Sequence, residues 1–138
     1  MACRPAAVQH SDMPSNIQIV RSPDFLRVRS DGRADLEAGK KLLAGIAEAA
    51  LRLDDYCLMV DMRDTSGQLS PDDQLELAGS LLRYGGTFLH KTAILCPRER
   101  FDHARFFSML AGNHGFRRIR AFFDYEVAME WLLDPTID

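Results

Sequence analysis

The sequence predicts a single α/β domain built on one mostly parallel, mixed sheet with the element order ββαβαβαβα. Three observations predict this fold class. The chain has 138 residues, which suits one domain with one hydrophobic core. Its apolar share of 46% and charged share of 27% are typical of globular proteins. Strand-like apolar runs alternate with amphipathic helical segments, which requires a mostly parallel sheet with right-handed crossovers. We expect this domain over residues 17–134, after a mobile tail at residues 1–16.

Two short β-branched or alternating runs, at residues 17–20 and 25–30, open the domain. The segment between them contains Pro23 and reads as a turn, so the two runs predict a hairpin. A helix is predicted next, over residues 34–53, because apolar residues recur there at intervals of three and four positions.

A near-continuous apolar run at residues 56–61 predicts a strand covered on both faces, as in the centre of a parallel sheet. The next helix is predicted over residues 71–84, since Ser70 is a suitable N-cap and Pro71 suits the first helical position. The Gly-Gly pair that follows ends this helix.

The second half of the chain repeats the alternation of strand and helix. Strands are predicted at residues 90–96 and 117–124, and helices at residues 98–114 and 125–134. Met109 and Val127 are among the apolar residues of these two helices that we expect to face the core.

Composition limits the partners and cofactors. A net charge of -3 favours neither nucleic acid nor an anionic membrane. The three cysteines are widely spaced and odd in number, which argues against a disulfide framework and favours the cytoplasm. We expect no transmembrane segment, because no apolar run is long enough to span a bilayer. The four histidines lack zinc-binding spacing, so neither a metal nor a cofactor is expected.

Three segments carry a resemblance to a known group: CLMVDMRDTSG at residues 57–67, HKTAILCP at residues 90–97 and IRAFFDYEVAMEWL at residues 119–132. They resemble the STAS and SpoIIAA-like group of small α/β domains, and the resemblance covers about residues 17–133. It implies a non-enzymatic domain that binds a protein partner or a small ligand, often in bacterial signalling. Some relatives in the SpoIIAA-like group are similar in fold to lipid-carrier domains.

A polar stretch directly after the buried strand is the first candidate site. It consists of Asp61, Arg63, Asp64, Thr65, Ser66 and Gly67. Ligands collect at the carboxyl ends of strands in open parallel sheets, so this stretch, expected to be a turn, is predicted to bind a partner. The alternative is structural: Asp61 pairs with Arg63 or with the loop backbone, and the two hydroxyl residues form an ordinary turn.

The resemblance also implies a modification. In STAS proteins that antagonise anti-sigma factors, a phosphorylated serine lies in an Asp-Ser-Ser-Gly turn before a helix. The similar tetrapeptide here is DTSG at residues 64–67, which places the acceptor at Ser66. This chain differs from that pattern, because few residues separate Asp61 from the tetrapeptide and the next helix has its own cap at Ser70.

Two further features bear on ligands. Six arginines stand between residues 98 and 120, and Arg98, Arg118 and Arg120 are predicted as anion-binding residues, with a solvated face as the alternative. Aromatic residues of the second half have enough bulk to line an apolar pocket under helices 71–84 and 98–114. Such a pocket predicts a lipid or another apolar ligand.

Catalysis is not predicted. Cys57, at the start of a buried strand, reads as a small core residue, whereas Cys96, at the carboxyl end of a strand, reads as a partly exposed thiol. A nucleophilic role for Cys96 would need a histidine such as His103 beside it, and the interpretation without catalysis is favoured. We therefore predict a non-catalytic binding or regulatory domain, first as a protein-interaction module in bacterial signalling. The alternative is a carrier of a lipid or small apolar ligand. The sequence leaves the partner, the ligand and the oligomeric state open.

Overall fold

The computed structural model describes residues 6–8, 15–20 and 25–135. Within these residues, six strands form one mixed sheet in the order β1-β2-β3-β4-β5-β6. They are β1 (Ala6–Val8), β2 (Ser15–Val20), β3 (Phe25–Arg33), β4 (Cys57–Ser66), β5 (Thr92–Leu95) and β6 (Ile119–Phe122). β2 is antiparallel to both of its neighbours, β1 and β3, and β3 to β6 run parallel. The predicted hairpin is thus confirmed as the β2–β3 pair.

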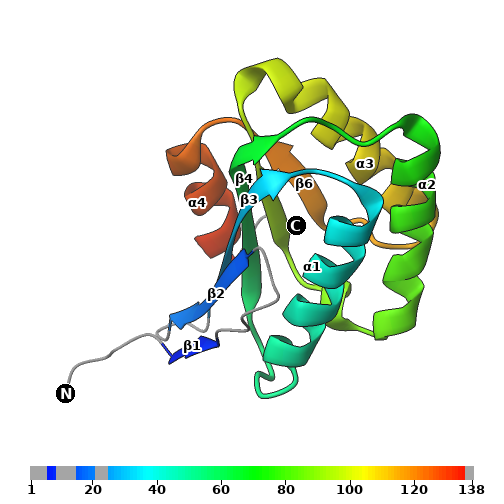
Figure 1. The fold of residues 1–138 in the computed structure, drawn as a ribbon. Helices are drawn as coiled ribbons and strands as arrows, with labels where there is room; N and C mark the ends of the chain where they lie inside the picture. The colour runs from blue at the N-terminus through cyan, green and yellow to red at the C-terminus, as the bar shows by residue number, and fades with distance from the viewer. Residues whose placement is uncertain (1–5, 9–14, 21–24, 136–138) are drawn as a thin grey trace.

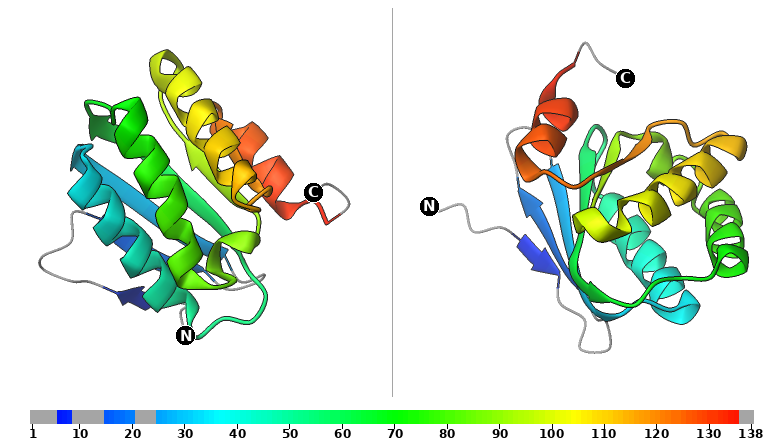
Figure 2. Two further views of the ribbon diagram at one scale, coloured as in Figure 1. Left: turned by 90° about the vertical axis from the view of Figure 1, so that its right-hand side faces the viewer. Right: turned by 90° about the horizontal axis from the view of Figure 1, so that it is seen from above.

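Helices cover both faces of the sheet. They are α1 (Leu36–Ala50), α2 (Pro71–Ser80), α3 (Phe101–Asn113) and α4 (Tyr125–Leu133), with short 3-10 helices η1 (Leu81–Tyr84), η2 (Thr87–Leu89) and η3 (Arg98–Arg100). In Figure 1, α1, α2 and α3 lie on one side of the sheet and α4 lies on the other, and Figure 2 shows the same division from above. The structure therefore has three layers in its second half.

Side-chain caps fix the helix starts. The Asp35 carboxylate accepts a hydrogen bond from the Ala38 amide at the start of α1, and the Ser70 hydroxyl accepts one from the Asp73 amide at the start of α2. Asp124 caps α4 in the same way. The predicted cap and first-turn proline of α2 are confirmed, and Gly85 ends the following 3-10 turn with a φ of 58°.

The strand β4 belongs to two cores, as its continuous apolar run predicts. Leu58 and Val60 face the larger core under α1, α2 and α3. Cys57 and Met59 face the smaller core under α4, where Trp131 is the largest side chain. Burial of both faces explains why this strand reads as a run of apolar residues rather than an alternation.

Some expectations need correction. A strand, β1, lies within the predicted tail, while residues 1–5 and 9–14 of that tail lie outside the described residues. Met109 and Val127 do not face the core, since 55% and 49% of their surfaces are exposed. In the part of the chain that the structure describes, none of the helices combines the length and the apolar character that a membrane span requires.

Candidate functional site

The stretch predicted as a polar turn is a strand. β4 continues through Ser66, because β3 also continues past its buried part and pairs with it: Asp31 faces Asp64, Gly32 faces Thr65 and Arg33 faces Ser66. Main-chain hydrogen bonds of this kind do not depend on apolar side chains. Only the last residue of the stretch, Gly67, lies beyond the strand, with a φ of 74°.

A register shift divides this stretch between the two faces of the sheet. From Arg29 to Asp31, β3 advances by two residues while β4 advances by three, from Asp61 to Asp64. The extra residue is a β-bulge, which reverses the alternation of the side chains. As a result Thr65 is buried on the side of α1, whereas Asp61 lies on the side of α4.

Asp61 forms a local ion pair with Arg63. Asp61 is 2% exposed, and its carboxylate accepts hydrogen bonds from Arg63 Nε at 3.0 Å and Nη2 at 2.9 Å, and from the Arg63 amide at 3.1 Å. Burial raises the pKa of Asp61, but these bonds and the guanidinium charge outweigh burial, so the pKa lies below its usual value. Asp61 therefore makes the contacts that the structural alternative predicts, an ion pair with Arg63 and a hydrogen bond from the backbone.

The remaining residues of the stretch also bind within the sheet. Thr65 donates from Oγ1 to the Ser30 carbonyl oxygen at 3.2 Å, and Ser66 donates from Oγ to the Gly32 carbonyl oxygen at 3.3 Å. Asp64 forms an exposed ion pair with Arg29 at 2.8 Å. The structure does not bring the six predicted residues together around one point.

The three predicted anion-binding arginines are also apart. Arg98 follows β5 and lies over the Phe123 ring at 4.5 Å, whereas Arg118 precedes the parallel neighbour β6, so the two stand at opposite ends of these strands. Arg120 lies over the Trp131 ring at 5.2 Å, on the α4 side.

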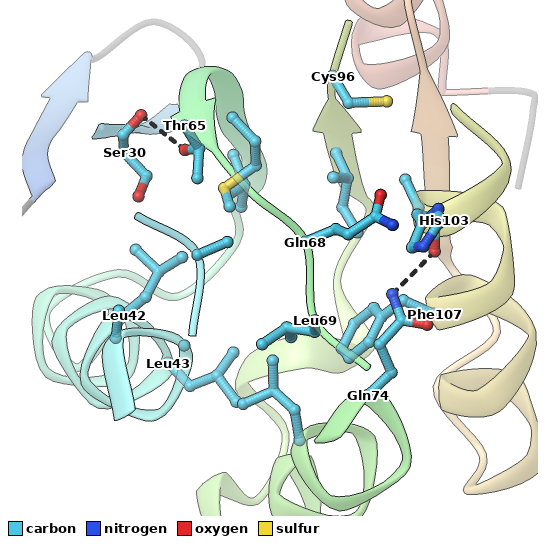
Figure 3. A pocket seen from close by; sticks show the side chains of 18 of the residues that line it. Ser30, Leu42, Leu43, Thr65, Gln68, Leu69, Gln74, Cys96, His103 and Phe107 are labelled. Atoms are coloured by element: carbon cyan, nitrogen blue, oxygen red, sulfur yellow. Dashed lines mark hydrogen bonds between the residues drawn. The ribbon is translucent and has the colours of Figure 1, made fainter. Parts of the chain in front are cut away.

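A cavity of about 180 Å³ lies between α1, α2, α3 and the sheet, under the helices where a pocket is predicted, and the phenylalanines that line it are Phe88 and Phe107. We call it the central cavity. Figure 3 shows Leu42 and Leu43 of α1 on one side, with His103 and Phe107 of α3 on the other. Other apolar walls come from Ile46, Val60, Met62, Leu69, Leu77, Leu81, Phe88, Ile94 and Ile119.

The buried polar groups of the cavity wall bond to the backbone. Besides the bond from Thr65 to Ser30, Gln74 donates from Nε2 to the His103 carbonyl oxygen at 3.1 Å, as Figure 3 shows. Thr92 donates from Oγ1 to the His90 carbonyl oxygen at 3.0 Å. Because these donors are already paired, the cavity offers mainly apolar contacts.

Cys96 lines the cavity as a buried thiol, and the expectation of a partly exposed one is wrong. The residue is 4% exposed, and its Sγ lies 3.4 Å from the Phe122 carbonyl oxygen, as a weak donor. Burial raises its pKa to about 11, so the thiol is protonated near neutral pH. Among the described residues, no three His, Cys, Asp or Glu side chains gather in a way that could hold a metal ion.

The cavity opens at the carboxyl ends of β3 and β4. Its exposed lining residues all lie there: Arg33, Asp35, Gly67 and Gln68. Half-buried Arg100 completes this rim and donates from Nη1 to the Gly67 carbonyl oxygen at 2.8 Å. We call these five residues the cavity rim. Of these five residues, the sequence predicts only Gly67 as a site residue. Arg33 and Arg100 could have been found by their positions, because Arg33 ends β3 and Arg100 ends η3, the short helix that follows β5.

The fold has a counterpart of known structure. No protein-family model and no curated protein matches the sequence. The structure is similar to that of an uncharacterised DUF3478-family protein with a SpoIIAA-like fold from Shewanella loihica PV-4. The two chains share 20% identity with a TM-score of 0.57, over 91% of this chain and 98% of the other. This chain thus has the SpoIIAA-like α/β fold that its sequence segments predict.

Proposed function

With a SpoIIAA-like fold around an apolar cavity as the premise, we propose that this protein is a non-catalytic binding domain whose central cavity takes up a small apolar molecule. The central cavity carries the proposal. It has apolar walls from three helices and the sheet, and an opening at the strand ends, where ligands of open α/β sheets bind.

The size of the cavity limits the ligand. An engineered apolar cavity of about 150 Å³ stays dry and binds benzene, whereas sites for drug-sized ligands measure about 300 Å³ or more. At about 180 Å³, the central cavity suits a single ring or a short hydrocarbon chain. A two-chain lipid would fit only if the helices moved apart.

Two observations support a role without catalysis. The Asp61 carboxylate is bound by Arg63, and the Cys96 thiol is protonated near neutral pH because burial raises its pKa. Neither group is available as a general base or as a nucleophile in this arrangement.

Filling the cavity tests the proposal. Toluene should raise the melting temperature of the wild-type protein, because a ligand that binds only the folded state stabilises it. Ala104→Leu, which adds bulk to the cavity wall, should abolish the increase while keeping the fold. Ala44→Leu adds the same bulk on the exposed face of α1 and should leave the increase intact. An equal response of wild type and Ala104→Leu would contradict uptake into the cavity.

A protein-interaction role in bacterial signalling is the second candidate. It is favoured by two leucines on the outer side of the helical layer: Leu75 of α2 and Leu82 of η1 are 52% and 60% exposed. The exposed hydroxyl of Ser66 lies on the same end of the domain as the start of α2.

The second candidate has a separate test. Replacing Leu75 and Leu82 with glutamate should weaken binding of a partner that co-purifies with the protein, while Leu51→Glu, at an 83% exposed site directly after α1, should not. If Ser66 is the regulatory acceptor, Ser66→Asp weakens the same complex and Ser66→Ala does not. Equal affinities of these two variants would remove phosphorylation from the proposal.

A further inference from the structure

Two arginines flank one glycine at the opening of the central cavity. Arg100 donates to the Gly67 carbonyl oxygen at 2.8 Å. Arg33 Cγ lies 3.8 Å from the point where a Cβ on Gly67 would stand. Both arginines line the cavity, so their side chains border the space that a ligand would leave or enter.

Neither arginine is neutralised by a carboxylate among the described residues. Arg29 and Arg63, by contrast, form ion pairs with Asp64 and Asp61. The acidic residue of the rim is Asp35, and one of its oxygens caps α1 by accepting from the Ala38 amide. With two arginines and one aspartate, the cavity rim carries a net charge of about +1 near neutral pH.

The start of α1 also borders the opening, where Asp35 caps the helix and Glu37 lies in its first turn. The lining residues Ala34, Asp35 and Ala38 belong to the start of this helix of 15 residues, so its first turn borders the opening. A rim with one net positive charge above an apolar interior is complementary to an amphipathic monoanion.

We propose that the ligand of the central cavity is a small apolar carboxylate, with its hydrocarbon part between α1, α2 and α3 and its carboxylate between Arg33 and Arg100. This inference rests on the proposed uptake of an apolar molecule and specifies the class of that molecule. A guanidinium matches a carboxylate because its N–H donors lie in one plane and form two parallel hydrogen bonds. Arg100 uses Nη1 for Gly67, which leaves its other N–H groups for the ligand.

Calorimetry with octanoate and 1-octanol separates the charge from the hydrocarbon chain. The two probes have the same number of carbon atoms, and octanoate is ionised at pH 7.5. We expect wild type to bind octanoate about tenfold or more tightly than 1-octanol, because hydrogen bonds to charged groups are stronger than neutral ones. Raising the ionic strength should reduce this preference, since salt screens charges near the surface.

Variants assign the preference to the rim. Arg33→Gln and Arg100→Gln should each lower octanoate affinity several-fold and leave 1-octanol affinity unchanged, and the double variant should bind both probes equally. Arg100→Lys keeps the charge and should retain part of the preference. Arg105→Gln removes the same charge from an exposed site on α3 outside the cavity and should change neither affinity.

Two different failures can be told apart. If wild type binds both probes equally, or if Arg105→Gln lowers octanoate affinity as much as Arg100→Gln does, the carboxylate inference is wrong while uptake of an apolar molecule stands. If neither probe binds, or if Ala104→Leu binds both probes as wild type does, the proposed function itself is wrong.

Discussion

The Nζ of Lys91 donates a hydrogen bond to the Trp131 carbonyl oxygen over 2.8 Å. A second bond from the same ammonium group reaches the Asp134 carbonyl oxygen, at 2.6 Å. Lys91 is only 6% exposed. The last carbonyl groups of a helix lack partners within the helix and carry partial negative charge, so this lysine both satisfies and stabilises the end of α4. Lys91 directly precedes β5, so these bonds also hold the end of α4 against the start of that strand.

Lys91→Met should therefore destabilise the protein. Methionine keeps the length of the apolar stem but removes two charge-assisted hydrogen bonds, and we expect a loss of about 2 kcal/mol in the free energy of unfolding. Urea denaturation monitored by Trp131 fluorescence measures this loss. Lys41→Met, at an exposed position of α1, is the matched control and should change the free energy by less than about 0.5 kcal/mol.

The Asp61–Arg63 pair predicts a dependence on pH. The pKa of Asp61 is lowered in the folded protein, so its ion pair stabilises the fold above the ordinary carboxyl pKa, and this stabilisation is lost as the pH falls through the lowered value. Wild type should exceed Asp61→Asn in stability by about 2 kcal/mol at pH 7. The difference should shrink when urea denaturation is repeated below about pH 4.

A comparison variant is available on the same strand. Asp64 pairs with Arg29 in the open, with 57% and 58% of the two side chains exposed. Asp64→Asn should cost at most about 1 kcal/mol at any pH. If both variants lost equal stability at pH 7, burial of the Asp61 carboxylate would not be what makes its ion pair strong.

Replacing Gly39 with alanine should change ligand binding in the central cavity more than it changes the stability of the fold. A Cβ at this position of α1 would lie 2.9 Å from Leu77 Cδ2, so Leu77 must shift, and the central cavity offers it space. Alanine is also favoured over glycine within a helix by about 1 kcal/mol. Gly39→Ala should thus change the free energy of unfolding by less than about 1 kcal/mol while weakening toluene or octanoate binding.

Gly112 is the matched control in α3. An added Cβ there meets nothing within 4 Å, so Gly112→Ala should stabilise the protein slightly and leave ligand affinity unchanged. If Gly39→Ala lowered the free energy of unfolding by several kcal/mol, Leu77 would have no room to move. That result would contradict the presence of the central cavity beside it.

The two buried thiols should be slow to react. Burial raises the pKa of both Cys57 and Cys96 to about 11, so roughly 0.1% of each is thiolate at pH 8. Alkylation by iodoacetamide, mapped to individual peptides by mass spectrometry, should be slow at both sites in the folded protein and fast in urea. Rapid alkylation of Cys96 alone in the folded protein would indicate that iodoacetamide enters the cavity and that the thiol ionises there more readily than its burial predicts.

Much of the fold follows from the pattern of apolar residues. The strand at residues 56–61 reads as covered on both faces, and Leu58 and Met59 do face different cores. The end of that strand could not be found in the same way. Its last residues are polar and are held by backbone pairing with β3, and the bulge that turns Thr65 inward is a property of two strands together rather than of either sequence.

The sequence indicates where the central cavity lies, but it does not indicate which residues form the cavity rim. Helical periodicity gives an apolar face, but the angle at which a helix meets the sheet decides which edge of that face is buried, and this explains the exposed Met109 and Val127. The arginine-rich segment drew attention to charge at the strand ends. Arg100 proved to lie at the cavity and Arg98 to stack on Phe123, a distinction that depends on the path of η3.

The pairing of β4 up to its last residue limits how a kinase reaches Ser66. Solvent reaches this residue, but its carbonyl oxygen accepts from the Ala34 amide at 2.8 Å and its hydroxyl is bonded to Gly32. A kinase that needs the backbone on both sides of its target would first have to peel this end of β4 away from β3, so the rate of modification would follow the opening equilibrium of the strand end. The rate at which Ser66 gains a phosphate would then depend on how often the end of β4 separates from β3.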